Sequence, residues 1–187
     1  QRQMCIRDSS GRAILANYED GKIRMEEIHR FSNDPVTICG TFYWDILRLF
    51  FEIKQGISKA VHQGGFDAIG IDTWGVDFGL LDKKGRLLNN PVHYRDTRTT
   101  GIMEKVFEKV PQEELYGETG IQLMRINTIF QLYSLVLNEP ETLAQADKLL
   151  LIPDLFAYLL TGEQRAEYTE VSTTQMLNPR TGDWHYE

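Results

Sequence analysis

The hydrophobic period of this chain changes twice near its beginning, and that change limits the folds open to it. Apolar and polar residues alternate from Ala13 to Glu19 and again from Ile23 to Phe31, which predicts two strands, and Asp20–Gly21 favours a tight turn between them. From Asp45 the apolar residues fall at helical spacing, before a buried-strand pattern returns over Phe66–Ile71. The order strand, strand, helix, strand predicts an α/β fold in which helices flank a mixed sheet.

The ends of the predicted helices are marked by capping residues. Asp45 is a suitable N-cap for the first helix, and Gly64–Gly65 end it. After residue 98 the pattern is mainly helical, with Asn127 expected to cap a helix over 128–137 and Asp154 one over 155–160. No linker divides the chain, which predicts one domain.

Composition excludes several classes of protein. The chain has 187 residues, 42% of them hydrophobic and 25% charged, which is typical of a folded domain rather than a disordered one. A net charge of −7 argues against a nucleic-acid partner, and no apolar run is long enough for a membrane span. Cys5 and Cys39 are too few for a disulfide framework, so a reducing, cytoplasmic location is expected. The histidines lack metal-ligand spacing and are expected at the surface: His29, His62, His93 and His185.

A polar and aromatic cluster follows the strand that ends at Asp72. Thr73, Trp74 and Gly75 come directly after it, and Asp77 lies two residues beyond Gly75. Ligands of open α/β sheets gather at the carboxyl ends of strands, and a carboxylate, an indole and a glycine suit a polyol. Strand alternation would place Asp77 on the face of Gly75 and opposite Trp74. The alternative interpretation is that Asp72 caps a turn and Trp74 fills the core.

Two further clusters have a structural and a functional interpretation. Ser9, Ser10, Gly11 and Arg12 precede the first clear strand and could bind phosphate oxygens, or form a plain surface turn. The segment 94–98, which reads YRDTR, could join two loops through an arginine–carboxylate pair or touch a ligand. Four aromatic residues of the helical part are expected in the core: Phe130, Tyr133, Phe156 and Tyr158.

The first eight residues, QRQMCIRD, are a poor start to the strand pattern that follows. We expect residues 1–8 to be a foreign or disordered leader, and residues 9–187 to be part of a longer protein.

Several blocks, in this order and spacing, resemble the FGGY family of carbohydrate kinases. They are SSGR at 9–12, GIDTWGVDFGLLD at 70–82, PVHYRDTRT at 91–99, LLLIPDLFAYLLTG at 149–162 and EYTEVSTTQMLNPRTGDW at 167–184. Within the family, TWGVDF and YRDTRT resemble the rhamnulokinases more than the glycerol, xylulose or gluconate kinases.

The resemblance implies an actin-like, ribonuclease-H-like fold and transfer of a phosphoryl group from ATP, with Mg²⁺, to L-rhamnulose. It implies two domains around a cleft, of which residues 9–187 are the N-terminal one. It places Ser9, Ser10, Gly11 and Arg12 in the ATP phosphate loop. It makes Gly75 a contact of the sugar, with Thr73, Trp74 and Asp77 beside it.

Two departures from the family pattern limit what is carried over. The family has an Asp-x-Gly stretch before the SSGR block, whereas this chain has MCIRD, so Asp8 is given no role. The family's general base belongs to a His-Asp-Thr block of the C-terminal nucleotide-binding domain, and these residues contain no such block. We therefore assign no catalytic residue and expect this chain alone to be inactive.

Three other functions remain open from the sequence. A sister enzyme such as fuculokinase would differ only in its sugar, and a non-catalytic sugar-binding module would bind sugar without nucleotide. A metal-dependent nuclease using Asp72 and Asp77 would need further carboxylates and a basic groove, and the acidic charge argues against it.

Overall fold

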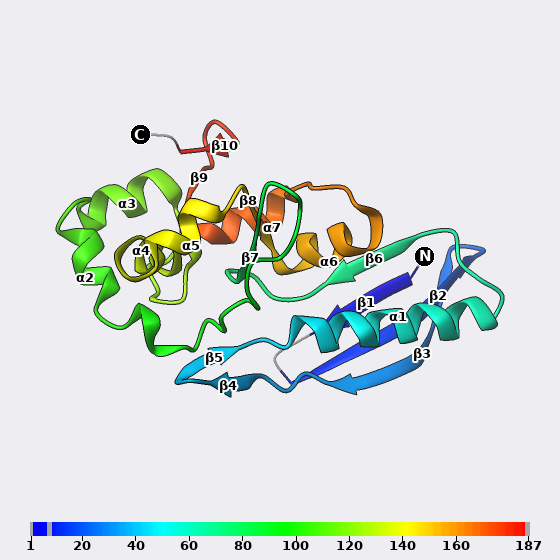
Figure 1. Cartoon of the computed structure of the whole chain (residues 1–187). Helices are drawn as coiled ribbons and strands as arrows, with labels where there is room; N and C mark the ends of the chain where they lie inside the picture. The colour runs from blue at the N-terminus through cyan, green and yellow to red at the C-terminus, as the bar shows by residue number, and fades with distance from the viewer. Residues whose placement is uncertain (1, 7–8, 186–187) are drawn as a thin grey trace.

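A four-stranded sheet with the order β3-β2-β1-β6 forms one side of the molecule (Figure 1). The computed structural model describes residues 2–6 and 9–185. The strands of this sheet are β1 (Arg2–Ile6), β2 (Ser10–Glu19), β3 (Lys22–Ser32) and β6 (Ile69–Asp72). β2 is antiparallel to both of its neighbours, whereas β1 and β6 are parallel. The expected α/β fold with a mixed sheet is confirmed.

The first strand falls within the segment expected to be a leader. Arg2–Ile6 lies between β2 and β6 and pairs with both. Residues 1, 7 and 8 of the expected leader lie outside the described residues. The foreign origin of the segment stays a prediction.

Helix α1 (Ile46–His62) lies along β2 and β3, as its helical period predicts. The Asp45 carboxylate accepts a hydrogen bond from the Arg48 N–H at 3.1 Å, which confirms the expected N-cap. Ile46, Leu49 and Ile53 on the inner face of the helix are almost fully buried. Their burial against the sheet stabilises the helix more than its intrinsic propensity does.

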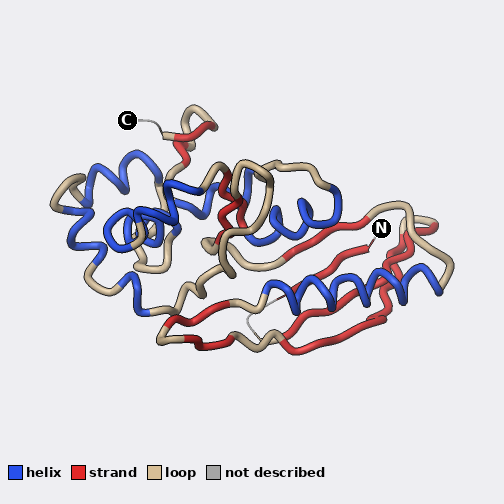
Figure 2. Tube along the Cα trace, in the orientation of Figure 1, coloured by secondary structure: helices blue, strands red, loops and turns tan. Residues whose placement is uncertain are grey.

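The second half of the chain is mainly helical, and Figure 2 shows most of these helices to one side of the main sheet. The α-helices are α2 (Ile102–Phe107), α3 (Gln112–Thr119), α4 (Thr128–Asn138), α5 (Pro140–Gln145), α6 (Ile152–Thr161) and α7 (Tyr168–Val171). Two 3₁₀ turns accompany them, η1 (Thr97–Thr99) and η2 (Ser172–Thr174). Asp154, expected as an N-cap, lies instead inside the first turn of α6.

Six short strands form three separate antiparallel pairs. They are β4 (Val36–Ile38) with β5 (Thr41–Tyr43), β7 (Phe78–Leu81) with β8 (Lys148–Leu151), and β9 (Leu177–Asn178) with β10 (Asp183–Trp184). β7 therefore pairs with β8 rather than with a strand of the main sheet.

The largest hydrophobic cluster joins the sheet to α1 and α6, with Trp44, Leu49 and Phe156 among its buried members. A smaller cluster around Phe130 joins α2, α3 and α4. Phe130 and Phe156 are fully buried, as expected, whereas Tyr133 and Tyr158 are half-buried at the edges of their clusters.

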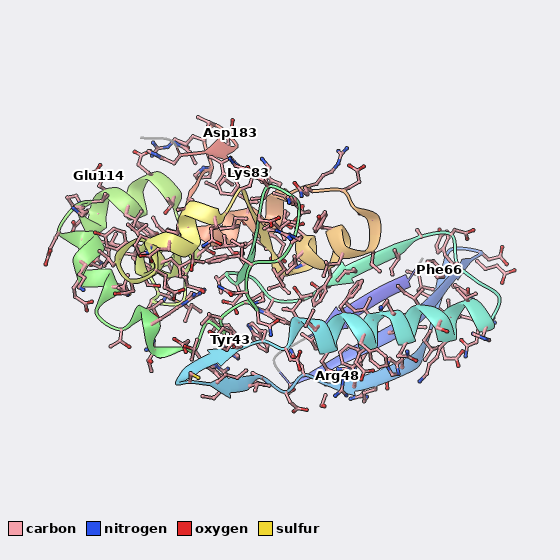
Figure 3. All side chains as sticks on the ribbon, viewed as in Figure 1. Tyr43, Arg48, Phe66, Lys83, Glu114 and Asp183 are labelled. Carbon is pink, nitrogen blue, oxygen red and sulfur yellow. The ribbon has the colours of Figure 1, made fainter. Side chains whose placement is uncertain are left out.

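Figure 3 shows how far these two parts extend, with Arg48 beside the sheet and Glu114 and Asp183 at the helical end. Within the described ranges, no helix combines the length and the apolar character that crossing a bilayer requires.

Candidate functional site

The two predicted binding segments lie at the same edge of the main sheet. β1 and β6 are parallel neighbours, with Cys5 opposite Asp72, so their carboxyl ends lie side by side and point toward the centre of Figure 1. Ser9 and Ser10 follow the end of β1, and Thr73 follows the end of β6. β2 pairs with β1 on the other side, with Gly11 opposite Ile6, so the start of β2 lies about two strand spacings, roughly 10 Å, from the end of β6. The topology therefore places the two candidate segments at the same edge of the sheet.

The segment from Ser9 to Arg12 is only partly open to solvent. Ser9 is exposed, Ser10 is half-buried, and the Arg12 guanidinium lies 3.9 Å from Glu27, with its side chain 45% exposed. Gly11 is buried against Phe31: a Cβ atom at Gly11 would lie 2.1 Å from the aromatic ring. Packing alone thus explains this glycine, and ATP binding by the four residues stays a prediction.

Trp74 lies half-buried on a stack of aromatic rings. Its ring centroid is 4.1 Å from that of the fully buried Trp44, which in turn stacks on His93 at 3.9 Å. The expectation that His93 lies at the surface is therefore wrong, since its side chain is buried within this stack. His29 is also mostly covered, with its Nε2 atom 2.7 Å from Glu52 Oε2. An aromatic stack of this kind holds the indole of Trp74 in a fixed position.

Asp77 is completely buried beneath this stack and accepts four hydrogen bonds. Its Oδ2 atom accepts from Trp44 Nε1 at 2.6 Å, from Trp74 Nε1 at 3.1 Å and from the Tyr94 N–H at 3.2 Å. Its Oδ1 atom accepts from Gln131 Nε2 at 2.9 Å. Burial raises the pKa of Asp77 to about 6, although these donors oppose the rise. Asp77 thus anchors the aromatic residues from below rather than facing solvent.

The expectation that Trp74 and Asp77 lie on opposite faces is wrong, since their side chains are hydrogen-bonded. Val76 between them has a φ of +69°, and the Asp77 N–H donates to Gly75 O at 3.0 Å. The chain therefore makes a tight turn here, and the alternation of an extended strand does not apply.

Gly75 is required by the close approach of another segment. A Cβ atom at this position would lie 2.9 Å from Thr173 Oγ1, so the space that the sequence suggested for a ligand is partly filled by a protein side chain. Thr73, which is also half-buried, donates its hydroxyl to Trp74 O at a long 3.4 Å. Sugar binding by Thr73, Trp74, Gly75 and Asp77 stays a prediction.

The charged segment at 94–98 makes contacts that hold loops together. Asp96 Oδ2 accepts from the Phe42 N–H at 2.7 Å, and Asp96 Oδ1 accepts from the Arg98 N–H at 2.7 Å. Arg98 Nη2 donates to Gln131 Oε1 at 2.5 Å, and burial lowers the pKa of Arg98. These contacts join loops, as the structural interpretation expected, but they run through backbone N–H groups and the Gln131 amide.

Several residues of the site had no clear signal in the sequence. Trp44, Thr128, Gln131 and Thr173 belong to three separate segments, and each contacts the stretch 74–77. The signal that the sequence offered was the presence of polar residues, Thr128 and Gln131, in a mostly apolar helix. In the structure both are fully buried, and buried polar side chains need hydrogen-bond partners.

Known proteins that resemble this chain are sugar kinases. Residues 8–187 match the N-terminal domain model of the FGGY family of carbohydrate kinases. The rhamnulokinase of Bacteroides thetaiotaomicron is 46% identical over 174 residues, covering 92% of this chain and 36% of that protein. The rhamnulokinase of Halalkalibacterium halodurans is 47% identical over 178 residues, covering 94% and 38%.

Solved structures show the same fold at low sequence identity. The gluconate kinase of Lactobacillus acidophilus aligns with a TM-score of 0.86 at 20% identity, covering 99% of this chain and 38% of that one. A xylulose kinase of the same organism aligns with a TM-score of 0.85 at 19% identity and similar coverage. The fold is the actin-like fold of these kinases, and the chain spans just over a third of the length of the curated relatives it matches. The chain therefore belongs to the FGGY family of carbohydrate kinases, of which it matches the N-terminal domain.

Proposed function

We propose that this chain is the sugar-holding part of a kinase that converts L-rhamnulose and ATP to L-rhamnulose 1-phosphate and ADP. The observation that carries the proposal is that the Trp74–Gly75 turn and the Ser9–Ser10 segment lie at the same edge of the main sheet, past the carboxyl ends of β6 and β1. The choice of sugar is supported by the relatives named rhamnulokinase at 46% and 47% identity. A cytoplasmic location stays a prediction.

The proposed sugar site uses the ring of Trp74 and the groups next to it. Because the indole N–H already donates to Asp77, Trp74 offers its aromatic face, which suits the C–H groups of a sugar. Among the described residues, the Thr73 hydroxyl makes one hydrogen bond, which is long at 3.4 Å, so it can exchange that bond for one to a sugar hydroxyl. Asp77 contributes by holding the indole in place.

The proposed phosphate site uses the Ser9 and Ser10 hydroxyls and the half-exposed guanidinium of Arg12. These groups donate hydrogen bonds of the kind that phosphate oxygens accept. For Mg²⁺ the fit is incomplete, because the part of the chain that is described contains no cluster of three or more histidine, cysteine or acidic side chains suited to a metal. We therefore expect the phosphates of the nucleotide, rather than these side chains, to supply most of the negative charge that Mg²⁺ needs.

In the proposed reaction, a sugar hydroxyl oxygen forms a bond to the γ-phosphorus of ATP while the bond to the ADP oxygen breaks. The hydroxyl proton passes to a general base, which the family resemblance places in the C-terminal domain. The part of this chain is to hold the hydroxyl in line with the phosphate.

A chimera tests the proposal directly. This chain would replace the matching 36% of the B. thetaiotaomicron rhamnulokinase, and ADP release would be followed with L-rhamnulose and ATP. We expect sugar-dependent turnover that falls strongly when Trp74 is changed to alanine, with Tyr18→Ala, at an exposed aromatic residue far along β2, as the matched control. A folded chimera without turnover would contradict the proposal, and faster turnover of L-fuculose would favour a fuculokinase.

A further inference from the structure

Val76 has a backbone conformation that β-branched residues almost never adopt. Its φ of +69° lies in the left-handed region, and a hydrogen bond of 3.0 Å joins the Asp77 N–H to Gly75 O across it. A bond from residue i+2 to residue i around a central residue of positive φ marks the rare, strained form of the γ-turn. Strain of this kind persists only where surrounding contacts impose it.

Three side chains from two distant segments hold both backbone polar groups of Val76. Thr128 Oγ1 donates to Val76 O at 2.7 Å, and Gln131 Nε2 donates to the same oxygen at 3.2 Å. The Val76 N–H donates to Thr173 Oγ1 at 3.2 Å. Thr128 and Gln131 belong to α4 and are completely buried, so their own positions are fixed by packing. We call Thr128, Gln131 and Thr173 the Val76 clamp.

The clamp also contacts Asp77, the residue to which the Trp74 indole is hydrogen-bonded. Gln131 Nε2 donates to Asp77 Oδ1 at 2.9 Å, and Asp77 Oδ2 accepts from Trp74 Nε1. Thr173 fills the space beside Gly75. The clamp therefore contacts the turn on both sides of Val76, at Gly75 and at Asp77.

We propose that the Val76 clamp consists of positioning residues, which force the strained turn and thereby set the orientation of the Trp74 indole for the sugar. The identity of the ligand as a sugar rests on the proposed function, whereas the effect of the clamp on the orientation of the indole does not. If the clamp were absent, Val76 would relax toward negative φ, and Trp74 and Asp77 would move apart.

Isosteric substitutions at Thr128 test this. Thr128→Val removes the hydroxyl that donates to Val76 O, and Thr128→Ser keeps it. Thr119→Val is the matched control, because Thr119 is also buried and donates to a backbone carbonyl, Leu115 O, at 2.7 Å. The readouts are the NMR signal of the Trp74 indole N–H and its change on titration with L-rhamnulose. Of the three variants, we expect only Thr128→Val to move the indole signal. It should also weaken sugar binding roughly fivefold, the effect of about one lost hydrogen bond.

A rescue variant separates positioning from general stability. In Val76→Gly/Thr128→Val, glycine adopts positive φ without being forced, so the indole signal and the sugar affinity should return toward those of the unchanged chain. An unmoved indole signal in Thr128→Val, or no recovery in the double variant, would overturn the inference. If L-rhamnulose leaves the unchanged chain unaffected, the sugar assignment fails, and the position of the indole signal alone then decides for or against the clamp.

Discussion

At the scale of single residues, Asp77 makes the stability of the domain depend on pH. Its carboxyl is fully buried, and burial raises its pKa to about 6 from an ordinary value of 3.8. The folded state therefore holds this proton more tightly than the unfolded state, so Asp77 favours folding most below pH 4. As pH rises from about 4 to about 6, that contribution falls by about 3 kcal/mol, at about 1.4 kcal/mol for each pKa unit.

Two measurements check this prediction. The carboxyl carbon signal of Asp77 should titrate near pH 6 in NMR, and urea unfolding should show the loss of stability over the same range. Glu52 acts in the opposite direction: burial alone would raise its pKa, but His29 and Arg48 lower it below the usual value. The Asp77→Asn variant lacks this carboxyl, so the difference between the two proteins in how the free energy of unfolding changes with pH belongs to Asp77. The same pH dependence in both proteins would contradict the prediction.

Gly11 is predicted to be essential for packing at the sheet edge. Gly11→Ala would place a Cβ atom 2.1 Å from the ring of the buried Phe31, so we expect a loss of about 1–3 kcal/mol in the free energy of unfolding. Gly117→Ala is the control, because this helical glycine has open space at its Cβ position and should be neutral or slightly stabilised. Equal stability of the two variants in urea unfolding would refute the packing argument.

At the scale of elements, those with a strong local pattern were predictable from the sequence. The β2–β3 hairpin and α1 follow from alternation, a turn at Asp20–Gly21 and the Asp45 cap, all of which are local properties. The pairing of β7 with β8 was not predictable, because 66 residues separate the end of one strand from the start of the other. The turn at Val76 was hidden for a similar reason: side chains from α4 and η2 impose it against the local preference of valine.

β1 is predicted to be required for folding. It bonds to β2 on one side and to β6 on the other, so its removal would leave two strands with unpaired backbone groups inside the sheet. A chain that begins at Ser9 should therefore lose cooperative unfolding and associate, as measured by circular dichroism and light scattering. A five-residue strand of alternating valine and threonine in place of residues 2–6 should restore folding, since the backbone pairing is what is replaced. A monomeric, cooperatively unfolding chain from Ser9 would contradict this requirement.

At the scale of the whole molecule, the sequence located the candidate site but not its internal geometry. The strand end next to Thr73 could be placed by the α/β pattern. The strand end before Ser9 could not, because residues 1–8 were expected to be a leader and β1 was not expected. The buried network below them could not, because Trp44, Asp77 and Gln131 meet only after three segments have packed together. The sequence therefore indicates a candidate edge of the sheet, and packing decides which side chains are open there.

The chain alone is predicted to show no measurable phosphorylation of L-rhamnulose. The family resemblance places the general base outside these residues, and a base contributes about 10²–10⁴ in rate. Misalignment of the two substrates costs more, since one face of a cleft cannot hold the sugar hydroxyl in line with the phosphate. ADP release by the isolated chain should therefore equal the background, whereas the chimera with the remainder of the B. thetaiotaomicron rhamnulokinase should turn over sugar at the same chain concentration. Sugar-dependent ADP release from the isolated chain would show that these residues contain a complete active site. It would contradict the proposal that a second domain supplies the general base.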